Sequence, residues 1–201
     1  MASSRQAAIR TKARPLRSGL EHLLAAVLLV IAIGAPASAN SPTLPALIKP
    51  LDLVIYRPGT KPPDFSGPTL DSQSLSLSKL RGKVVVINFW ASWCHECRPE
   101  MPVLEQLHRE FGGRGLAIVG INARENAEAI RRYAKELGLT FPLILDPDGR
   151  INALFGVIGL PATFVIGRDG RAVAFGVGSR KWESPPARAL IEALLAERAS
   201  R

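Results

Sequence analysis

Cysteine and histidine are almost absent from this sequence. The 201 residues include two cysteines, Cys94 and Cys97, and three histidines. A structural zinc site needs four ligands, usually two cysteine pairs or one pair with histidines, so the composition offers too few ligands for one. Two cysteines also exclude a small scaffold that depends on several disulfides.

Dense runs of basic residues are absent as well. The formal net charge is +9, but no Lys/Arg cluster is interleaved with aromatic side chains, and part of the charge falls in the first 39 residues. A nucleic-acid-binding protein would carry a basic patch or stripe. We therefore expect no nucleic-acid partner.

The N-terminus has the pattern of an export segment. A basic stretch ending at Arg17 precedes an apolar run over residues 23–35, and Ala-Ser-Ala ending at Ala39 suits signal peptidase. The most apolar part is shorter than the ~20 residues of a membrane span. Two alternatives stay open: a signal peptide cleaved after Ala39, or a retained anchor that associates with the membrane through residues 23–39. Both predict a periplasmic or other extracytoplasmic location, which is an oxidising compartment.

Composition divides the chain into three regions. Residues 1–39 are the predicted signal peptide or N-terminal anchor. Prolines punctuate residues 40–62, which we expect to form a tether with a short strand over residues 51–55. Residues 63–201 have the composition of a globular domain.

Strands and helices alternate along the globular domain. Strands are predicted as a hairpin within residues 64–83, at Val84–Trp90, over residues 115–122 and 141–146, and as a second hairpin around Asp169. Helices are predicted from near Cys97 to Phe111 and over residues 125–138, 151–155 and 185–198. This order predicts an α/β fold with a mixed central sheet flanked by helices and an N-terminal β-hairpin extension.

The two cysteines form a Cys-x-x-Cys motif between the strand Val84–Trp90 and the following helix. A disulfide across two residues closes a very small loop, so it would stabilise the fold only slightly. A helix start offers unpaired N–H groups and a favourable dipole to a thiolate. We interpret the pair as a redox couple in which Cys94 attacks a substrate disulfide and Cys97 resolves the mixed disulfide.

Two stretches of the sequence resemble a known family. "FWASWCHECRPEMP" and "GLPATFVIGRDG" are similar to the TlpA/ResA/CcmG group of extracytoplasmic thiol–disulfide oxidoreductases, over about residues 63–198. The resemblance implies a thioredoxin fold, with the Cys94–Cys97 disulfide as the redox group and with no separate cofactor or metal. It also implies a cis bond between Leu160 and Pro161 facing Cys94, where the backbone can pair with a peptide. Trp93 is expected to pack near the surface beside this substrate-binding region.

Glu100 and Asn88 are the residues that we expect to influence proton transfer. Glu100 follows Cys97 by three residues, and the resemblance implies that a glutamate here assists proton transfer. A partly buried glutamate would have a raised pKa and could accept the Cys97 proton, whereas the alternative is a solvated glutamate in the first helical turn. Asn88 stands where thioredoxins place a buried acid, and it cannot titrate.

The residues between the cysteines depart from the family pattern, which usually has proline before the second cysteine. Protonated His95 would stabilise the Cys94 thiolate and favour an oxidant. Glu96 would destabilise the same thiolate and favour a reductant. The two effects oppose each other, so the redox potential stays open.

The leading hypothesis is a monomeric reductant of disulfides in exported proteins, re-reduced by a membrane thiol donor. The resemblance implies targets such as apocytochrome c or copper-site assembly proteins. One alternative is a disulfide oxidant, although residues 122–159 could not supply the helical insertion of that class. Others are a copper-binding assembly factor using Cys94, Cys97 and His95, or an inert interaction module. The Pro-x-x-x-Thr-x-x-Cys arrangement of peroxidases is missing before Cys94.

Overall fold

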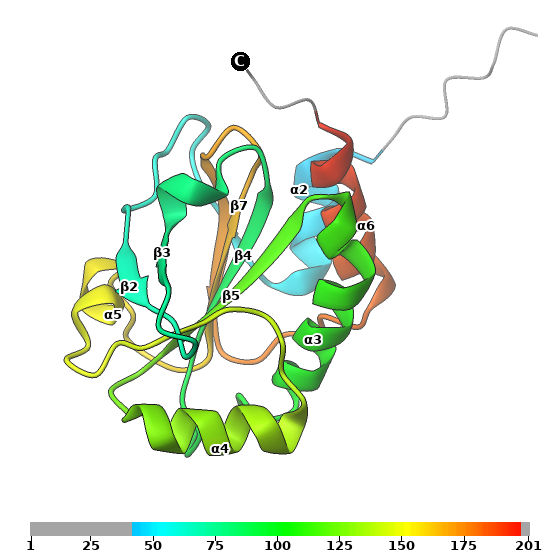
Figure 1. Cartoon of the computed structure of the whole chain (residues 1–201). Coiled ribbons are helices and arrows are strands. Elements are labelled where there is room, and N and C mark those ends of the chain that lie inside the picture. The colour runs from blue at the N-terminus through cyan, green and yellow to red at the C-terminus, as the bar shows by residue number, and fades with distance from the viewer. Residues whose placement is uncertain (1–41, 198–201) are drawn as a thin grey trace, which may run out of the picture. The chain divides into compact units, whose positions relative to one another are not determined.

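A six-stranded sheet forms the centre of the computed structural model, which describes residues 42–197 (Figure 1). The strand order is β1-β8-β7-β4-β5-β6. The strands are β1 (Val54–Ile55), β4 (Val84–Trp90), β5 (Leu116–Asn122), β6 (Leu143–Ile144), β7 (Ala162–Ile166) and β8 (Ala172–Val177). β4, β5 and β6 run parallel, whereas the pairs β4–β7, β7–β8 and β1–β8 are antiparallel. The sheet is therefore mixed, as predicted.

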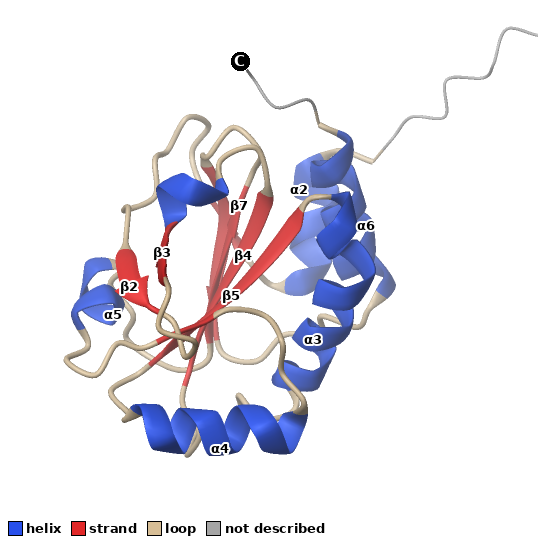
Figure 2. Cartoon of the chain, viewed as in Figure 1, coloured by secondary structure: helices blue, strands red, loops and turns tan. Residues whose placement is uncertain are grey.

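Helices and a small second sheet cover the two faces of this sheet (Figure 2). The buried residues of α2 (Leu44–Ile48), α3 (Glu100–Phe111), α4 (Ala127–Leu137) and α6 (Pro185–Ala196) join one core cluster. The other face packs against α5 (Arg150–Leu154) and the segment around the antiparallel hairpin of β2 (Ser66–Pro68) and β3 (Ser74–Ser76). This hairpin is the extension that the sequence predicted.

The central strand β4 is buried along its whole length, as its apolar run predicted. Successive side chains of a strand point to opposite faces. Val86 and Trp90 accordingly join the cluster under α3, whereas Ile87 and Phe89 join the cluster on the α5 face. Asn88 lies between Val86 and Trp90 in this alternation, two residues from each. Its side-chain amide therefore points to the α3 face of the sheet.

The Cys-x-x-Cys motif forms tight turns, and the predicted helix start near Cys97 is wrong. The N–H of Cys97 donates to the carbonyl of Cys94 (3.2 Å), and the N–H of Glu100 donates to the carbonyl of Cys97 (3.1 Å). This three-residue spacing is that of turns and 3-10 structure, not of an α-helix. The helix α3 begins at Glu100 with Pro99 as its N-cap, so Cys94 does not cap it.

The expected tether is folded from Pro42 onward. Both α2 and the following 3-10 helix (Lys49–Leu51) contribute buried residues to the core, and β1 pairs with β8. Two of the five prolines that suggested a tether, Pro45 and Pro50, occupy the first turns of these two helices. Proline is tolerated there because its missing N–H would have no intrahelical partner. The strand expected over residues 51–55 is shorter than predicted.

The predicted export segment, residues 1–39, lies outside the described residues. Within residues 42–197, no helix is both long enough and apolar enough to cross a membrane. The cleaved signal and the retained anchor therefore both remain predictions.

Candidate active site

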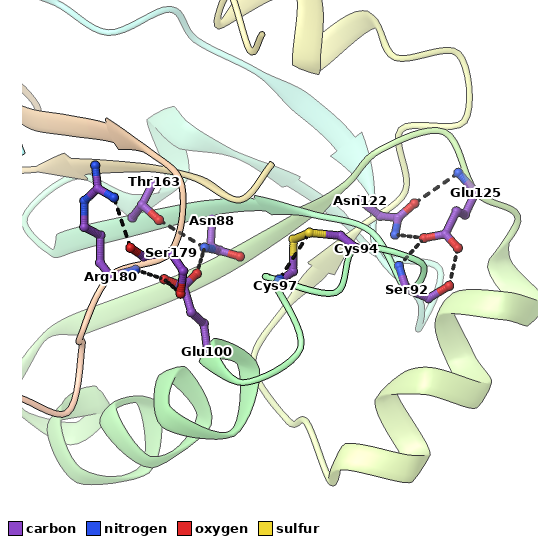
Figure 3. Close-up of a disulfide and its surroundings, with 10 residues drawn as sticks. All are labelled: Asn88, Ser92, Cys94, Cys97, Glu100, Asn122, Glu125, Thr163, Ser179 and Arg180. Carbon is purple, nitrogen blue, oxygen red and sulfur yellow. Dashed lines mark hydrogen bonds between the residues drawn. A yellow bond between two sulfur atoms is a disulfide. The ribbon is translucent and has the colours of Figure 1, made fainter. Parts of the chain in front are cut away.

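The two cysteines form a disulfide at the carboxyl end of β4 (Figure 3). Their Cα atoms are 5.3 Å apart. Cys94 keeps 6% of its surface exposed, whereas Cys97 is fully buried at 0%. The N–H of Cys97 points to the Sγ atom of Cys94 at 3.1 Å, and such a donor favours negative charge on that sulfur. Cys94 is therefore the cysteine that a substrate can reach.

A groove of about 640 Å³ opens beside Cys94. The turn of the motif, the loop after β5 and the loop before β7 supply its walls. Two apolar side chains at this groove are largely in solvent, because Trp93 is 70% exposed and Ile158 is 92% exposed. Exposed apolar side chains gathered at one site are typical of an interaction surface. Trp93 thus lies beside Cys94 at this groove with most of its surface in solvent, and its role in substrate binding stays a prediction.

The bond between Leu160 and Pro161 is cis, as the resemblance implied. Leu160 lines the groove together with Cys94. The carbonyl of Pro161 accepts the N–H of Gly178 at 2.7 Å and is therefore engaged with the end of β8. Within the described residues, the N–H and carbonyl of Leu160 make no hydrogen bond. The backbone that is available to an extended peptide is thus that of Leu160 rather than that of Pro161.

Glu100 is buried on the core side of the motif and only 3% exposed. Its Oε1 atom accepts the backbone N–H of Arg180 and faces Ser179 Oγ at 3.4 Å, while Oε2 faces Asn88 Nδ2 at 3.4 Å. Burial raises the pKa of Glu100 to about 7, against the lowering effect of these donors and of the Arg180 charge. The alternative of a solvated glutamate is excluded. A carboxyl group with a pKa near 7 can exchange protons at neutral pH.

Asn88 links Glu100 to the centre of the sheet. It is fully buried, and its Nδ2 atom also donates to Oγ1 of Thr163 on β7 at 3.0 Å. A neutral amide can donate to a carboxylate at this position, whereas a second acid would repel it. Asn88 therefore supports Glu100 without titrating.

His95 and Glu96 lie at the rim of the groove, and both are exposed. Among the described residues, neither side chain forms a hydrogen bond or an ion pair that would fix it against the sulfur of Cys94. Solvent and salt weaken the electrostatic effect of exposed charges. Their opposing influence on the Cys94 thiolate remains a prediction.

Sequence reasoning missed a second polar cluster, on the other side of the disulfide from Glu100 (Figure 3). The N–H of Ser92 donates to Glu125 at 2.7 Å, and the Ser92 hydroxyl donates to the same carboxylate. Nδ2 of Asn122 donates to Glu125 at 2.7 Å. The cluster ties the turn before Cys94 to the loop after β5. The polar Asn122 at the end of an apolar strand was the available signal.

A metal site is not favoured by this geometry. Within residues 42–197, no group of three or more His, Cys, Asp and Glu side chains is arranged to hold a metal ion. The copper-binding alternative uses Cys94 and Cys97, with His95 as an optional third ligand. The imidazole of His95 is exposed at the rim of the groove.

The site and the fold belong to one class of protein, the thioredoxin-like thiol–disulfide oxidoreductases. In this class a reactive cysteine pair follows the central strand and a cis-proline loop lies across from it. The chain itself belongs to the AhpC/TSA family, whose profile matches residues 58–174. The family resemblance inferred from the two motifs is thereby confirmed.

Individual relatives agree with this assignment. The chain is 40% identical to the thioredoxin-like protein YneN of Bacillus subtilis over 115 residues, which cover 56% of this chain and 66% of YneN. It is 33% identical to the thiol-disulfide oxidoreductase ResA of Bacillus subtilis over 121 residues, or 60% of this chain and 68% of ResA. The matches thus span about two thirds of each relative.

A solved structure shares the fold. The crystal structure of a thiol:disulfide interchange protein of the thioredoxin family from Chlorobium tepidum matches with a TM-score of 0.62 and 32% identity. The match covers 71% of this chain and 100% of that chain. The predicted thioredoxin fold is confirmed.

Proposed function

We propose that this chain is a thiol:disulfide oxidoreductase that reduces disulfides in exported proteins. The observation that carries the proposal is the disulfide between a reachable Cys94 and a covered Cys97. Glu100, which is buried, follows in the next turn, where its N–H donates to the carbonyl of Cys97 at 3.1 Å. A covered second cysteine cannot be attacked by a bulky substrate. It can attack Cys94, which is the geometry that a resolving cysteine requires.

The first step is attack by the Cys94 thiolate on one sulfur of the substrate disulfide. The substrate S–S bond breaks, a mixed disulfide forms between Cys94 and that sulfur, and the other sulfur leaves as a thiolate that takes a proton from water. The N–H of Cys97 supports the attacking thiolate, since it lies 3.1 Å from Sγ of Cys94.

The second step releases the substrate. The thiol of Cys97 gives its proton to the carboxylate of Glu100, and its sulfur attacks Sγ of Cys94. The Cys94–Cys97 bond forms, and the second substrate thiolate leaves and is protonated by water. The Cys94–substrate bond breaks in this step. Over both steps the substrate gains two electrons from the cysteine pair and two protons from water, while the proton of Cys97 is held by Glu100. A membrane thiol donor then reverses these events at the cysteine pair.

The groove supports an extended polypeptide as the substrate. It offers the unpaired backbone of Leu160 and the exposed side chains of Trp93 and Ile158. Main-chain hydrogen bonds give affinity for an extended chain regardless of its sequence, and apolar contacts add preference. Apocytochrome c and copper-site assembly proteins are substrates of the proposed kind. The export pattern before Asn40 places the reaction outside the cytoplasm, with membrane association through residues 23–39 if the segment is retained.

Trapping tests the proposed exchange. A Cys97→Ser variant, expressed with its export segment, should accumulate disulfide adducts of Cys94 with exported proteins. Cys94→Ser is the matched control, because it lacks the reachable thiol. A folded Cys97→Ser variant that captures no exported protein would contradict the exchange reaction.

The redox potential tests the direction. A potential near that of thioredoxin, about −270 mV, fits a reductant, whereas a potential near that of DsbA, about −120 mV, would indicate an oxidant. Equilibration of the Cys94–Cys97 pair with glutathione or dithiothreitol buffers measures this quantity.

A further inference from the structure

The guanidinium group of Arg180 is occupied by backbone carbonyls. Its Nη2 atom donates to the carbonyls of Asp52 (3.0 Å) and Val177 (3.1 Å), and Nη1 donates to the carbonyl of Ser179 (3.0 Å). The side chain is only 13% exposed, and Nη2 also lies 3.6 Å from the Asp52 carboxylate. A long charged side chain is thus fixed against three main-chain oxygens, so it orders the backbone around it.

The backbone that Arg180 orders is the one that holds Glu100. The N–H of Arg180 donates to Oε1 of Glu100, and the hydroxyl of Ser179 lies 3.4 Å from the same oxygen. Figure 3 shows both residues directed at the Glu100 carboxylate from the turn after β8. The main chain of Arg180 therefore contacts Glu100, while its side chain fixes the turn in place.

Two backbone features match this arrangement. Asp52 has a φ of 52°, a left-handed conformation that is unusual for residues other than glycine and that its surroundings have to maintain. Gly176 lies beside the guanidinium, and a Cβ atom there would be 2.7 Å from Cδ2 of Leu53 and 3.1 Å from Nη2 of Arg180. The chain leaves room for the Arg180 side chain at this point.

The contacts join two segments that flank the part of the chain matched by the family profile. That profile covers residues 58–174, so Asp52, Ser179 and Arg180 all lie beyond it. We propose that Arg180 is a positioning residue whose guanidinium fastens the turn after β8 to the segment before β1, so that this turn keeps the Glu100 carboxylate buried and in place. This inference rests on the proposed function, because it assigns a support to the proton acceptor of the second step.

A loosened turn would change the surroundings of Glu100 in a defined direction. Asn88 and Ser179, which hydrogen-bond to Glu100, are neutral, and Arg180 is the charged group identified as acting on its pKa among the described residues. The backbone N–H of Arg180, the hydroxyl of Ser179 and the Arg180 charge all lower the pKa of Glu100, so a loosened turn that moves them away should raise that pKa further.

The experiment compares Arg180→Met and Arg180→Lys with a matched control, Arg171→Met. Arg171 also donates to a backbone carbonyl, that of Gly59 at 2.6 Å, but it does not contact Glu100. Carboxyl NMR titration of the disulfide form measures the pKa of Glu100. Stopped-flow reduction of a peptide disulfide by the reduced protein measures the rate across pH.

Both Arg180 variants should raise the pKa of Glu100 and slow peptide reduction at pH 7 by about tenfold, because less of the carboxyl group is then ionised and able to accept a proton. Lysine keeps the charge but lacks the planar fork that reaches several carbonyls at once. Arg171→Met should behave like the parent protein. If Arg180→Met does not fold, Arg180→Lys carries the test.

An unchanged pKa of Glu100 in Arg180→Met would overturn the inference. Parent-like behaviour of Arg180→Lys would overturn it too, because charge alone would then suffice. A parent protein that reduces no disulfide would instead overturn the proposed function, and the NMR titration would still decide whether Arg180 positions Glu100.

Discussion

The first and second turns of α3 each bury a glutamate, and the two glutamates behave in opposite ways. Glu100 is 3% exposed and Glu105 is 5% exposed. The pKa of Glu100 is raised to about 7, whereas the pKa of Glu105 is lowered. The exposed fractions are thus nearly equal, but Glu100 lies deeper in the protein, so exposure alone does not decide which of the two carboxyl groups titrates at neutral pH.

Two differences separate the glutamates: Glu100 lies deeper in the protein, and the donors around each carboxylate differ. Burial raises the pKa of Glu105 as well, but close donors outweigh it: Thr140 N–H at 2.7 Å, Thr140 Oγ1 at 2.6 Å and Arg109 Nε at 2.5 Å. Glu100 has two side-chain donors at 3.4 Å and the backbone N–H of Arg180. Close donors and a paired cation keep a buried carboxylate ionised, whereas sparse donors let desolvation prevail. Glu105 is therefore suited to holding structure and Glu100 to moving a proton.

The largest expected effect is on the reaction. Glu100→Gln should slow reduction of a peptide disulfide at pH 7 by about 100-fold, because a glutamine cannot accept the Cys97 proton. Glu105→Gln should stay within about twofold of the parent once both are shown to be folded. Stopped-flow kinetics measure the two rates, and similar losses in both variants would remove the functional distinction between the glutamates.

The second expected effect is on the pH dependence of stability. The folded pKa of Glu100, about 7, lies above the ordinary value of 4.5, so its favourable contribution is complete below pH 4.5 and is lost as the pH rises through 7. As the pH rises from 4.5 to 8, the parent loses this contribution and the variant does not. The free energy of unfolding of Glu100→Gln, relative to that of the parent, should therefore increase by up to about 3 kcal/mol. Urea unfolding of the disulfide forms measures this difference. Parallel pH curves for variant and parent would show that Glu100 does not titrate in this range.

Replacement of Glu105 should give the opposite pH dependence of stability, and the change in the free energy of unfolding should be smaller. Glu105→Gln should lose about 2 kcal/mol of stability at pH 7, because Thr140 and Arg109 lose a charged acceptor. The folded pKa of Glu105 is depressed, so its contribution is present above the ordinary value of 4.5 and is lost as the pH falls through the folded value. Urea unfolding at pH 3 and pH 7 should show the gap between variant and parent narrowing at acid pH; a gap that widens would contradict this explanation.

The smallest expected effect would make Glu105 more like Glu100. Thr140→Val removes the hydroxyl donor at 2.6 Å and keeps the backbone N–H, so the pKa of Glu105 should rise. The expected cost in stability is about 1 kcal/mol. Carboxyl NMR titration measures the shift, and Ser179→Ala, which removes a donor at 3.4 Å from Glu100, should give a smaller change. An unchanged pKa in Thr140→Val would show that the hydroxyl is not what keeps Glu105 ionised.

Local patterns predicted much of the fold. The apolar run Val84–Trp90 predicted β4 with both boundaries correct, because a strand buried on both faces leaves a continuous signal in the sequence. The segment from Pro42 to Ile55 was misjudged, since proline marks both tethers and the first turns of helices. Composition alone does not separate these two cases.

The site was predicted where it depends on neighbouring residues. Cys94, Cys97 and Glu100 follow each other at short spacing, so a motif identifies them. Arg180 lies 80 residues from Glu100 and contacts it through a backbone N–H, a group that nearly every residue carries. No pattern of side chains in the sequence predicts such a contact. The contact between Glu105 and Thr140, which is also distant in the sequence, could not be predicted either.

The short strand β1 also protects the molecule from self-association. Without it, the six residues of β8 would form an open edge, and an unpaired edge is a template for pairing with another chain. β1 pairs with β8 over Val54 and Ile55, and its own outer edge is too short to recruit a further strand easily. The groove beside Cys94, which we propose binds extended substrate chains, is thus not joined by a second docking place for such chains at the β8 edge of the sheet.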